Sequence, residues 1–170
     1  MRKLVIDTET TGLTEKDRIC EIACIELIDN KRTGMVFHSY INPERESHPK
    51  ALEVHGLSSG FLADKPLFVD IASALMDFLG DSTWIIHNAP FDTKFIMREF
   101  YLLGKLLKPI TFCTLAFARR RHQLTSNTLN KLCELYKIDT SHRVVHGAYT
   151  DADILTQLYK RMVIDEQSKV

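Results

Sequence analysis

The chain reads Leu4-Val5-Ile6-Asp7-Thr8-Glu9-Thr10-Thr11-Gly12 close to its N-terminus. Three consecutive apolar residues are typical of a strand buried on both faces, and Thr-Thr-Gly predicts its exit turn. Side chains alternate along a strand, so Asp7 and Glu9 project to the same face, roughly 6 to 7 Å apart. Two carboxylates in a cleft raise each other's pKa unless a cation compensates them, and their oxygens favour Mg²⁺ or Mn²⁺. By itself, Asp-x-Glu is equally compatible with a solvated strand end.

The bulk composition bounds the class of protein. A chain of 170 residues with 45% hydrophobic content predicts a single globular domain over residues 1–170. It has no apolar run of membrane-spanning length and no signal-peptide pattern, so we expect a cytoplasmic protein without a membrane partner. The formal net charge is zero, which gives no sign of a polyanionic partner but still allows nucleic acid in a small cleft. The cysteines lack Cys-x-x-Cys spacing, which favours reduced thiols over zinc or disulfides.

The first part of the chain predicts three strands joined by short connections, which favours antiparallel pairing. A longer irregular segment follows and is a candidate substrate-side loop, with short helices near residues 50–54 and after Ser58. The strands are expected at residues 4–9, 19–28 and 35–41, with a turn over residues 29–34 and the irregular segment over residues 43–66.

The rest of the chain alternates strands with helices, so the fold class is α/β, a mixed five-stranded sheet with helices on both faces. Asn88 is expected to cap a helix that Pro90 opens. Further strands are expected at residues 84–86 and 111–112, and helices at 68–79, 90–103, 115–121, 128–136 and 148–162. The last helix has an apolar stripe at helical spacing, made of Ala148, Ala152, Leu155, Tyr159 and Met162.

Three further polar residues are weak candidates when each is taken alone. Asp92 lies in a first helical turn, where the helix dipole favours a carboxylate regardless of function. Asp151 lies early in the last helix at the edge of the apolar stripe, so it needs a partner. His146 lies in the loop before that helix, where a lone histidine is usually surface.

Taken together, three stretches resemble the three exonuclease motifs of the DEDDh (DnaQ-like) 3′-5′ exonucleases, in the same order and with similar separations. They are residues 7–12, residues 87–92 (His-Asn-Ala-Pro-Phe-Asp) and residues 146–151 (His-Gly-Ala-Tyr-Thr-Asp). The resemblance covers nearly the whole chain and is greatest to the epsilon proofreading subunits of bacterial DNA polymerase III. Residues 54–57, 118–119 and 136–139 also look similar to that group.

The resemblance implies a ribonuclease-H-like fold, a metal site and a reaction. Its metal-site acids would be Asp7, Glu9, Asp92 and Asp151, and His146 would be the general base. Two Mg²⁺ or Mn²⁺ ions roughly 3.5 to 4 Å apart can clamp the attacking and leaving oxygens of a phosphodiester hydrolysis. The implied product is a nucleoside 5′-monophosphate released from a 3′ end.

The resemblance also implies substrate contacts. Leu13 would pack against the terminal nucleobase, and the backbone near Thr10 would face the 3′-hydroxyl. His55 matches a position near the terminal nucleotide, and Lys50 replaces an acid of the epsilon subunits and is a candidate phosphate contact. For His55 and Lys50 a plain loop role is about as compatible with the sequence. The basic run at residues 119–122 is compatible with a contact to a phosphate backbone, but solvated surface is the favoured interpretation.

Some positions depart from the family pattern. Cys113 and Asn130 stand where the family usually has aspartates, neither of them a metal-site position. Tyr149 and Asp153 fit the Tyr-x-x-x-Asp spacing of the sister DEDDy group, which offers a rival version of the third motif. The neighbouring residues favour His146 with Asp151.

The resulting functional hypothesis is a metal-dependent DNA 3′-5′ exonuclease that proofreads. Its implied partners are a single-stranded or frayed 3′ end of DNA and a DNA polymerase subunit. An RNA exonuclease resembling ribonuclease T or oligoribonuclease uses the same chemistry and differs in whether its pocket admits the ribose 2′-hydroxyl. A non-catalytic polymerase-binding module is the alternative from a different class.

Overall fold

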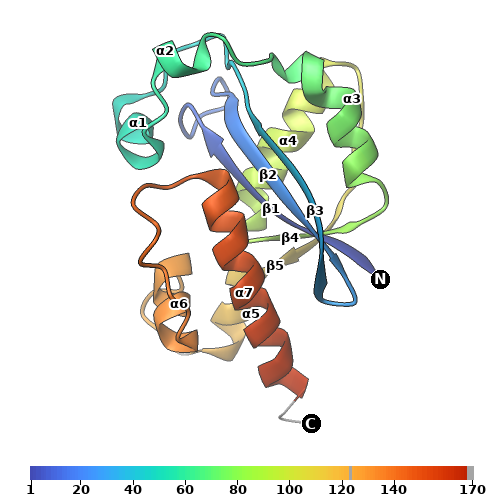
Figure 1. Cartoon of the computed structure of the whole chain (residues 1–170), viewed down its shortest axis with the longest axis vertical. Coiled ribbons are helices and arrows are strands. Elements are labelled where there is room, and N and C mark those ends of the chain that lie inside the picture. The colour runs from blue at the N-terminus through green and yellow to red at the C-terminus, as the bar shows by residue number, and fades with distance from the viewer. Residues whose placement is uncertain (123, 168–170) are drawn as a thin grey trace.

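The computed structural model describes residues 1–122 and 124–167. Its strands are β1 (Arg2–Thr10), β2 (Ile19–Ile28), β3 (Lys31–Tyr40), β4 (Thr83–Ile86) and β5 (Ile110–Cys113). They form a five-stranded sheet in the order β3-β2-β1-β4-β5 (Figure 1). The β1–β2 and β2–β3 pairs are antiparallel, whereas β1–β4 and β4–β5 are parallel. The predicted mixed sheet is confirmed, with β1 at its centre.

Helices cover both faces of the sheet, as predicted (Figure 1). The helices are α1 (Pro49–His55), α2 (Ser59–Leu62), α3 (Phe68–Leu79), α4 (Ala89–Leu102), α5 (Thr114–Arg121), α6 (Leu129–Tyr136) and α7 (Ala148–Gln167). On one face α3 and α4 pack against Leu4 and Ile6, and on the other α6 and α7 pack against Val5. The alternation of these three residues between two cores explains their uninterrupted apolar run. Among the described helices none is long and apolar enough to cross a membrane.

The apolar stripe predicted for the last helix is confirmed, because all five of its residues are buried against the sheet. The helix continues beyond residue 162 to Gln167, farther than expected. The segment after Met162 contains neither glycine nor proline, so no local signal ends the helix there.

Two local predictions are wrong for backbone reasons. The turn expected over residues 29–34 contains only Asp29 and Asn30, whose φ angles of 50° and 64° match a two-residue hairpin turn, so β3 already begins at Lys31. Asn88 occupies the N-cap position of α4, but its φ of 65° is left-handed and its side chain makes no capping hydrogen bond. Pro90 lies in the first turn of α4, as expected.

Candidate active site

The first two acids are positioned by β1. Val5 faces the core beneath α7, and the alternation of the strand directs Asp7 and Glu9 to that same face. Glu9 is 8% exposed, and Asp7 keeps part of its surface open to a neighbouring cavity. The central strand therefore presents two carboxylates toward the start of α7.

The third acid, Asp92, comes from the first turn of α4 and is buried. Thr8 lies between Asp7 and Glu9 but faces the opposite side of β1, where it binds the carboxylate of Asp92. The backbone N–H of Thr8 donates to Asp92 Oδ1 at 3.0 Å and the Thr8 hydroxyl donates to the same oxygen at 2.8 Å. This contact brings the third carboxylate to the end of the strand that carries Asp7 and Glu9.

The fourth acid, Asp151, lies buried in the first turn of α7. The start of this helix is fixed to β2 because the N–H of Ala148 donates to Glu21 Oε2 at 3.0 Å. The preceding loop is fixed to α1 because the N–H of His146 donates to the carbonyl oxygen of Val54 at 3.1 Å. These two contacts place both the helix and the loop of the third motif beside β1.

The carboxylates influence one another electrostatically. Burial, followed by the charges of Asp92, Asp151 and Glu9, raises the pKa of Asp7 well above its usual value. Burial and the charge of Asp151 raise the pKa of Glu9 to about 8, and burial raises the pKa of Asp92 to about 7. Ionising this cluster therefore costs free energy that a bound cation would recover.

The donor set fits a divalent metal ion. Ligand atoms of Glu9, His146 and Asp151 all lie within 4.8 Å of one another. Carboxylate oxygens are the ligands that Mg²⁺ and Mn²⁺ prefer, and burial raises the pKa values of Asp7, Glu9 and Asp92, so a cation would favour their ionised forms.

Arg143 is a partner of the site that the sequence interpretation missed. Its guanidinium donates to both carboxylate oxygens of Asp151, with Nε at 2.5 Å from Oδ1. Burial opposes ionisation of Asp151, but its contacts with His146 and Arg143 hold its pKa below the ordinary value. The sequence contained one signal for this pair. Asp151, an acid at the edge of an apolar stripe, needs a partner, and Arg143 lies eight residues before it.

The four residues expected to contact substrate line one cavity of about 660 Å³, together with Glu9. Leu13 is 79% exposed at this cavity, whereas Thr10 is buried and its hydroxyl donates to the carbonyl oxygen of Gly12. His55 is buried, and burial lowers its pKa. The residues expected here are Thr10, Leu13, Lys50 and His55.

A second cavity, of about 640 Å³, opens on the other side of the acids. Asp7, Asp151, Arg143 and His146 line it near the acids, and Arg119 lines it farther away. One residue of the basic run therefore borders a cavity of the site, although that run was interpreted as solvated surface.

The structure separates the rival third motif from the other acids. Asp153 pairs with Arg32 of β3 at 2.5 Å, and Tyr149 lies against the ring of His38. Asp151, by contrast, groups with Glu9 and His146.

The two departures from the family pattern have local roles. Cys113 caps α5, because its sulfur accepts from the N–H of Ala116 at 3.4 Å. The side-chain oxygen of Asn130 accepts from Arg143. The four cysteines are free thiols, as expected.

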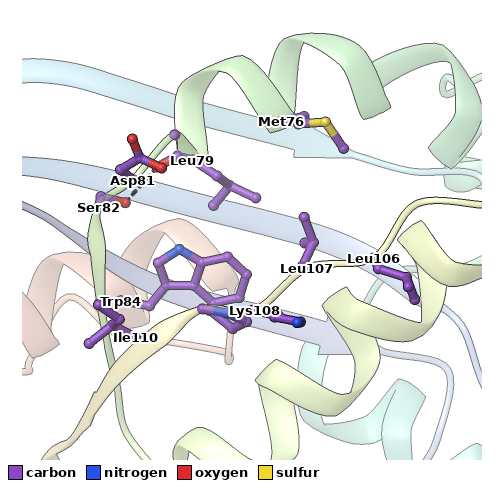
Figure 2. A pocket seen from close by; sticks show the side chains of 11 residues that line it. Met76, Leu79, Asp81, Ser82, Trp84, Leu106, Leu107, Lys108 and Ile110 are labelled. Carbon is purple, nitrogen blue, oxygen red and sulfur yellow. Dashed lines mark hydrogen bonds between the residues drawn. The ribbon is translucent and has the colours of Figure 1, made fainter.

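A third cavity, of about 400 Å³, lies away from the acids (Figure 2). Trp84, Leu107 and Ile110 line it where β4 and β5 begin, whereas Asp92 follows the carboxyl end of β4. Ligands of parallel sheets bind beyond the carboxyl ends of the strands. This cavity is therefore distinct from the acidic site.

Comparisons with known proteins agree with this geometry. Residues 4–159 match the model of the family described as "Exonuclease" (RNase_T). A DNA polymerase III subunit epsilon of Rickettsia prowazekii is 43% identical over 175 residues, covering 99% of this chain and 76% of the relative. A protein of the same name from Salmonella typhimurium is 41% identical, covering 95% of this chain and 71% of the relative.

Solved structures show the same fold. Exonuclease X, in complex with 5′ overhanging duplex DNA, has a TM-score of 0.75 and 25% identity, covering 96% of this chain and 92% of that chain. The nuclease domain of 3′hExo, a DEDDh family member bound to rAMP, has a TM-score of 0.78 at 15% identity with the same coverage. The chain therefore belongs to the exonuclease (RNase_T) family, with DNA polymerase III epsilon subunits among its relatives.

Proposed function

We propose that residues 1–170 form a single exonuclease domain that hydrolyses DNA from the 3′ end to nucleoside 5′-monophosphates and removes mispaired ends during replication. The observation that carries this proposal is the convergence of carboxylates from β1, α4 and α7: ligand atoms of Glu9, His146 and Asp151 lie within 4.8 Å of one another, and Thr8 binds Asp92 beside Asp7 and Glu9. The epsilon names of the relatives support DNA as the substrate and a polymerase subunit as the partner.

In this proposal Asp7, Glu9, Asp92 and Asp151 hold two Mg²⁺ or Mn²⁺ ions. When bound, the ions supply a clamp for the attacking and leaving oxygens of the scissile phosphodiester. Asp7 interacts electrostatically with all three other acids, so it would hold metal together with each of them. Thr8 fixes the orientation of Asp92 through its two hydrogen bonds.

The remaining steps fall to residues around the acids. The terminal nucleotide occupies the cavity lined by Thr10, Leu13, Lys50 and His55, with Leu13 against the base. His146 is 46% exposed beside Glu9 and Asp151, so its ring can take the proton of the attacking water. Burial lowers the pKa of His55 and so favours the neutral ring, which suits a hydrogen bond to the substrate.

A time course on 5′-labelled substrates tests the proposal. Single-stranded DNA, duplexes with a mismatched or a matched 3′ end, and short RNA are each incubated with Mg²⁺, Mn²⁺ or chelator. We expect stepwise release of mononucleotides from the 3′ end, faster on the mismatched duplex than on a matched one, and none with chelator. Faster release from RNA than from DNA would redirect the proposal to an RNA exonuclease, and no release with either metal would refute it.

A further inference from the structure

Arg143, in the loop before α7, places its guanidinium within the acidic cluster. Arg143 donates from Nε to Asp151 Oδ1 at 2.5 Å, from Nη2 to Asp151 Oδ2, and from Nη1 to the side-chain oxygen of Asn130. The side chains of Arg143 and Asp151 are only 8% and 5% exposed. This is a buried, two-point ion pair, the geometry in which a guanidinium binds a carboxylate most strongly.

The same guanidinium also contacts the candidate general base. Arg143 Nη2 lies 2.6 Å from His146 Nδ1. An arginine only donates hydrogen bonds, so Nδ1 accepts when it pairs with Arg143, and the ring proton of the neutral histidine then lies on Nε2. The other close contact of Nδ1, to Asp151 Oδ2 at 3.2 Å, needs a protonated Nδ1, so Arg143 and Asp151 compete for this nitrogen. In this arrangement the accepting nitrogen of His146 and both oxygens of Asp151 are engaged by one side chain.

Arg143 partly neutralises the cluster as a whole. Its positive charge lowers the pKa values of Asp7 and Glu9, opposing the effects of burial and of the other carboxylates. A divalent ion bound to Asp151 would perform the same electrostatic task. It would also lie within a few ångströms of the guanidinium, where two like charges repel.

We propose that Arg143 is an internal counter-ion that competes with the divalent metal for Asp151, so that metal binding displaces the guanidinium and frees His146 Nδ1. The proposal rests on the proposed function in taking Asp151 as a metal ligand. Arg143 already borders the cavity of about 640 Å³ that Arg119 also lines, so the displaced side chain has a polar space to enter.

Calorimetric titration of chelator-treated protein with Mn²⁺ tests this competition. Two ligands that exclude each other at one site weaken each other's binding, and couplings of this kind typically change affinity by about 5- to 150-fold. Replacing Arg143→Gln should therefore tighten Mn²⁺ binding about tenfold. A residue that merely supports the fold would leave the affinity unchanged or weaken it, and either result would overturn the proposal.

Thermal melting supplies a second readout that closes the thermodynamic cycle. In chelator, Arg143→Gln should melt below the wild-type protein because Asp151 loses its counter-ion, and saturating Mn²⁺ should remove most of that difference. If the variant does not fold in chelator, it is refolded with Mn²⁺, and Arg143→Lys replaces it in the melting series. A deficit that persists unchanged with Mn²⁺ would contradict the proposal.

Two variants serve as matched controls. Arg143→Lys keeps the charge but loses the two-point geometry, so its Mn²⁺ affinity should fall between wild type and Arg143→Gln. Arg32→Gln breaks a second arginine–aspartate pair, in which Arg32 of β3 contacts Asp153 of α7, and it should leave the Mn²⁺ affinity unchanged. If Arg32→Gln tightens binding as much as Arg143→Gln, the effect belongs to α7 in general and the proposal fails.

The titration also separates this inference from the proposed function. Wild-type protein that binds Mn²⁺ but releases no nucleotides would refute the function, while tighter binding by Arg143→Gln would still support the competition. An active wild-type enzyme whose affinity is not tightened by Arg143→Gln would refute the competition alone.

Discussion

Asp151 and Asp153 lie two positions apart in α7 but have different surroundings. Asp151 is buried beside Glu9 and His146, whereas Asp153 pairs with Arg32 at the surface. Loss of a residue that only hydrogen-bonds to a metal ligand can cost up to about 100-fold in activity. Replacing Asp151→Asn changes a proposed ligand itself, so nucleotide release should fall by more than about 100-fold. Asp153→Asn should retain most of the activity. Initial rates on labelled single-stranded DNA measure both, and the reverse pattern would assign the third motif to Tyr149 and Asp153.

Thr8 tests the importance of orienting Asp92. Thr8→Val keeps the shape of the side chain but removes the hydroxyl that donates to Asp92 Oδ1. Loss of such an outer partner typically costs about 10- to 100-fold in activity or metal affinity, and we expect a loss in that range in the initial rate. Thr8→Ser retains the hydroxyl and should retain most of the rate. Equal losses in both variants would mean that packing, rather than the hydrogen bond, matters at this position.

The resemblance predicted which acids form the candidate site but not which residues contact them. Asp7, Glu9, Asp92, His146 and Asp151 stand in recognisable stretches, so their convergence followed from the resemblance. The role of Thr8 depends on the other face of β1, where α4 begins, and the role of Arg143 depends on the path of an irregular loop. Neither relation is carried by residue spacing, because side-chain partners across elements are set by tertiary packing.

The connection between β1 and β2 has no space for a side chain at Gly12. A Cβ there would lie 2.6 Å from Asp17 Oδ2, and that carboxylate accepts hydrogen bonds from Thr11 and Thr14. Gly12→Ala should displace Asp17 and shift Leu13 in the substrate cavity. We expect a loss of about 1 to 3 kcal/mol in the free energy of unfolding and a raised KM.

Gly60 is the matched control for this prediction. It has no positive φ, and the nearest atom to an added Cβ is Ser58 Oγ at 4.0 Å, an ordinary contact. Gly60→Ala should change the free energy of unfolding by no more than about 0.5 kcal/mol and leave KM unchanged. Urea unfolding and steady-state kinetics measure the two effects, and similar behaviour of both variants would contradict the steric explanation.

The positions of helices and strands were predicted well where apolar residues recur at a regular spacing. They were predicted poorly where a left-handed backbone angle determines where an element begins. The apolar stripe of α7 and the bounds of α3, residues 68–79, follow from the pattern of the sequence. The start of β3 was missed because Asp29 and Asn30 both adopt left-handed angles, which composition indicates only as a turn of unspecified length.

The acid cluster should make the stability of the protein depend on pH. The pKa of Glu9 is raised to about 8 in the folded state, and the pKa values of Asp7 and Asp92 are raised as well. Such acids stabilise the fold fully below their unfolded pKa, and this contribution is lost as the pH rises toward the folded value. Chelated protein should therefore become less stable in urea as the pH rises from about 4.5 to about 8, and the trend should be clearest above about pH 7, where unfolded histidine is already neutral.

The slope of the free energy of unfolding against pH checks this prediction. Each proton released on unfolding contributes at most about 1.4 kcal/mol per pH unit. Glu9→Gln removes one titrating group and should flatten the slope, as should saturating Mn²⁺. Chelated wild-type protein whose stability is constant across this range would contradict the raised pKa values.

The hydrogen bond from the N–H of His146 to the carbonyl oxygen of Val54 connects the loop before α7 to α1. Val54 belongs to α1, which forms a wall of the cavity lined by Lys50 and His55. Under the proposed function, a badly seated DNA end that displaces α1 would also displace the backbone of His146, the proposed proton acceptor. One main-chain hydrogen bond would thereby link the seating of the end to the position of the general base.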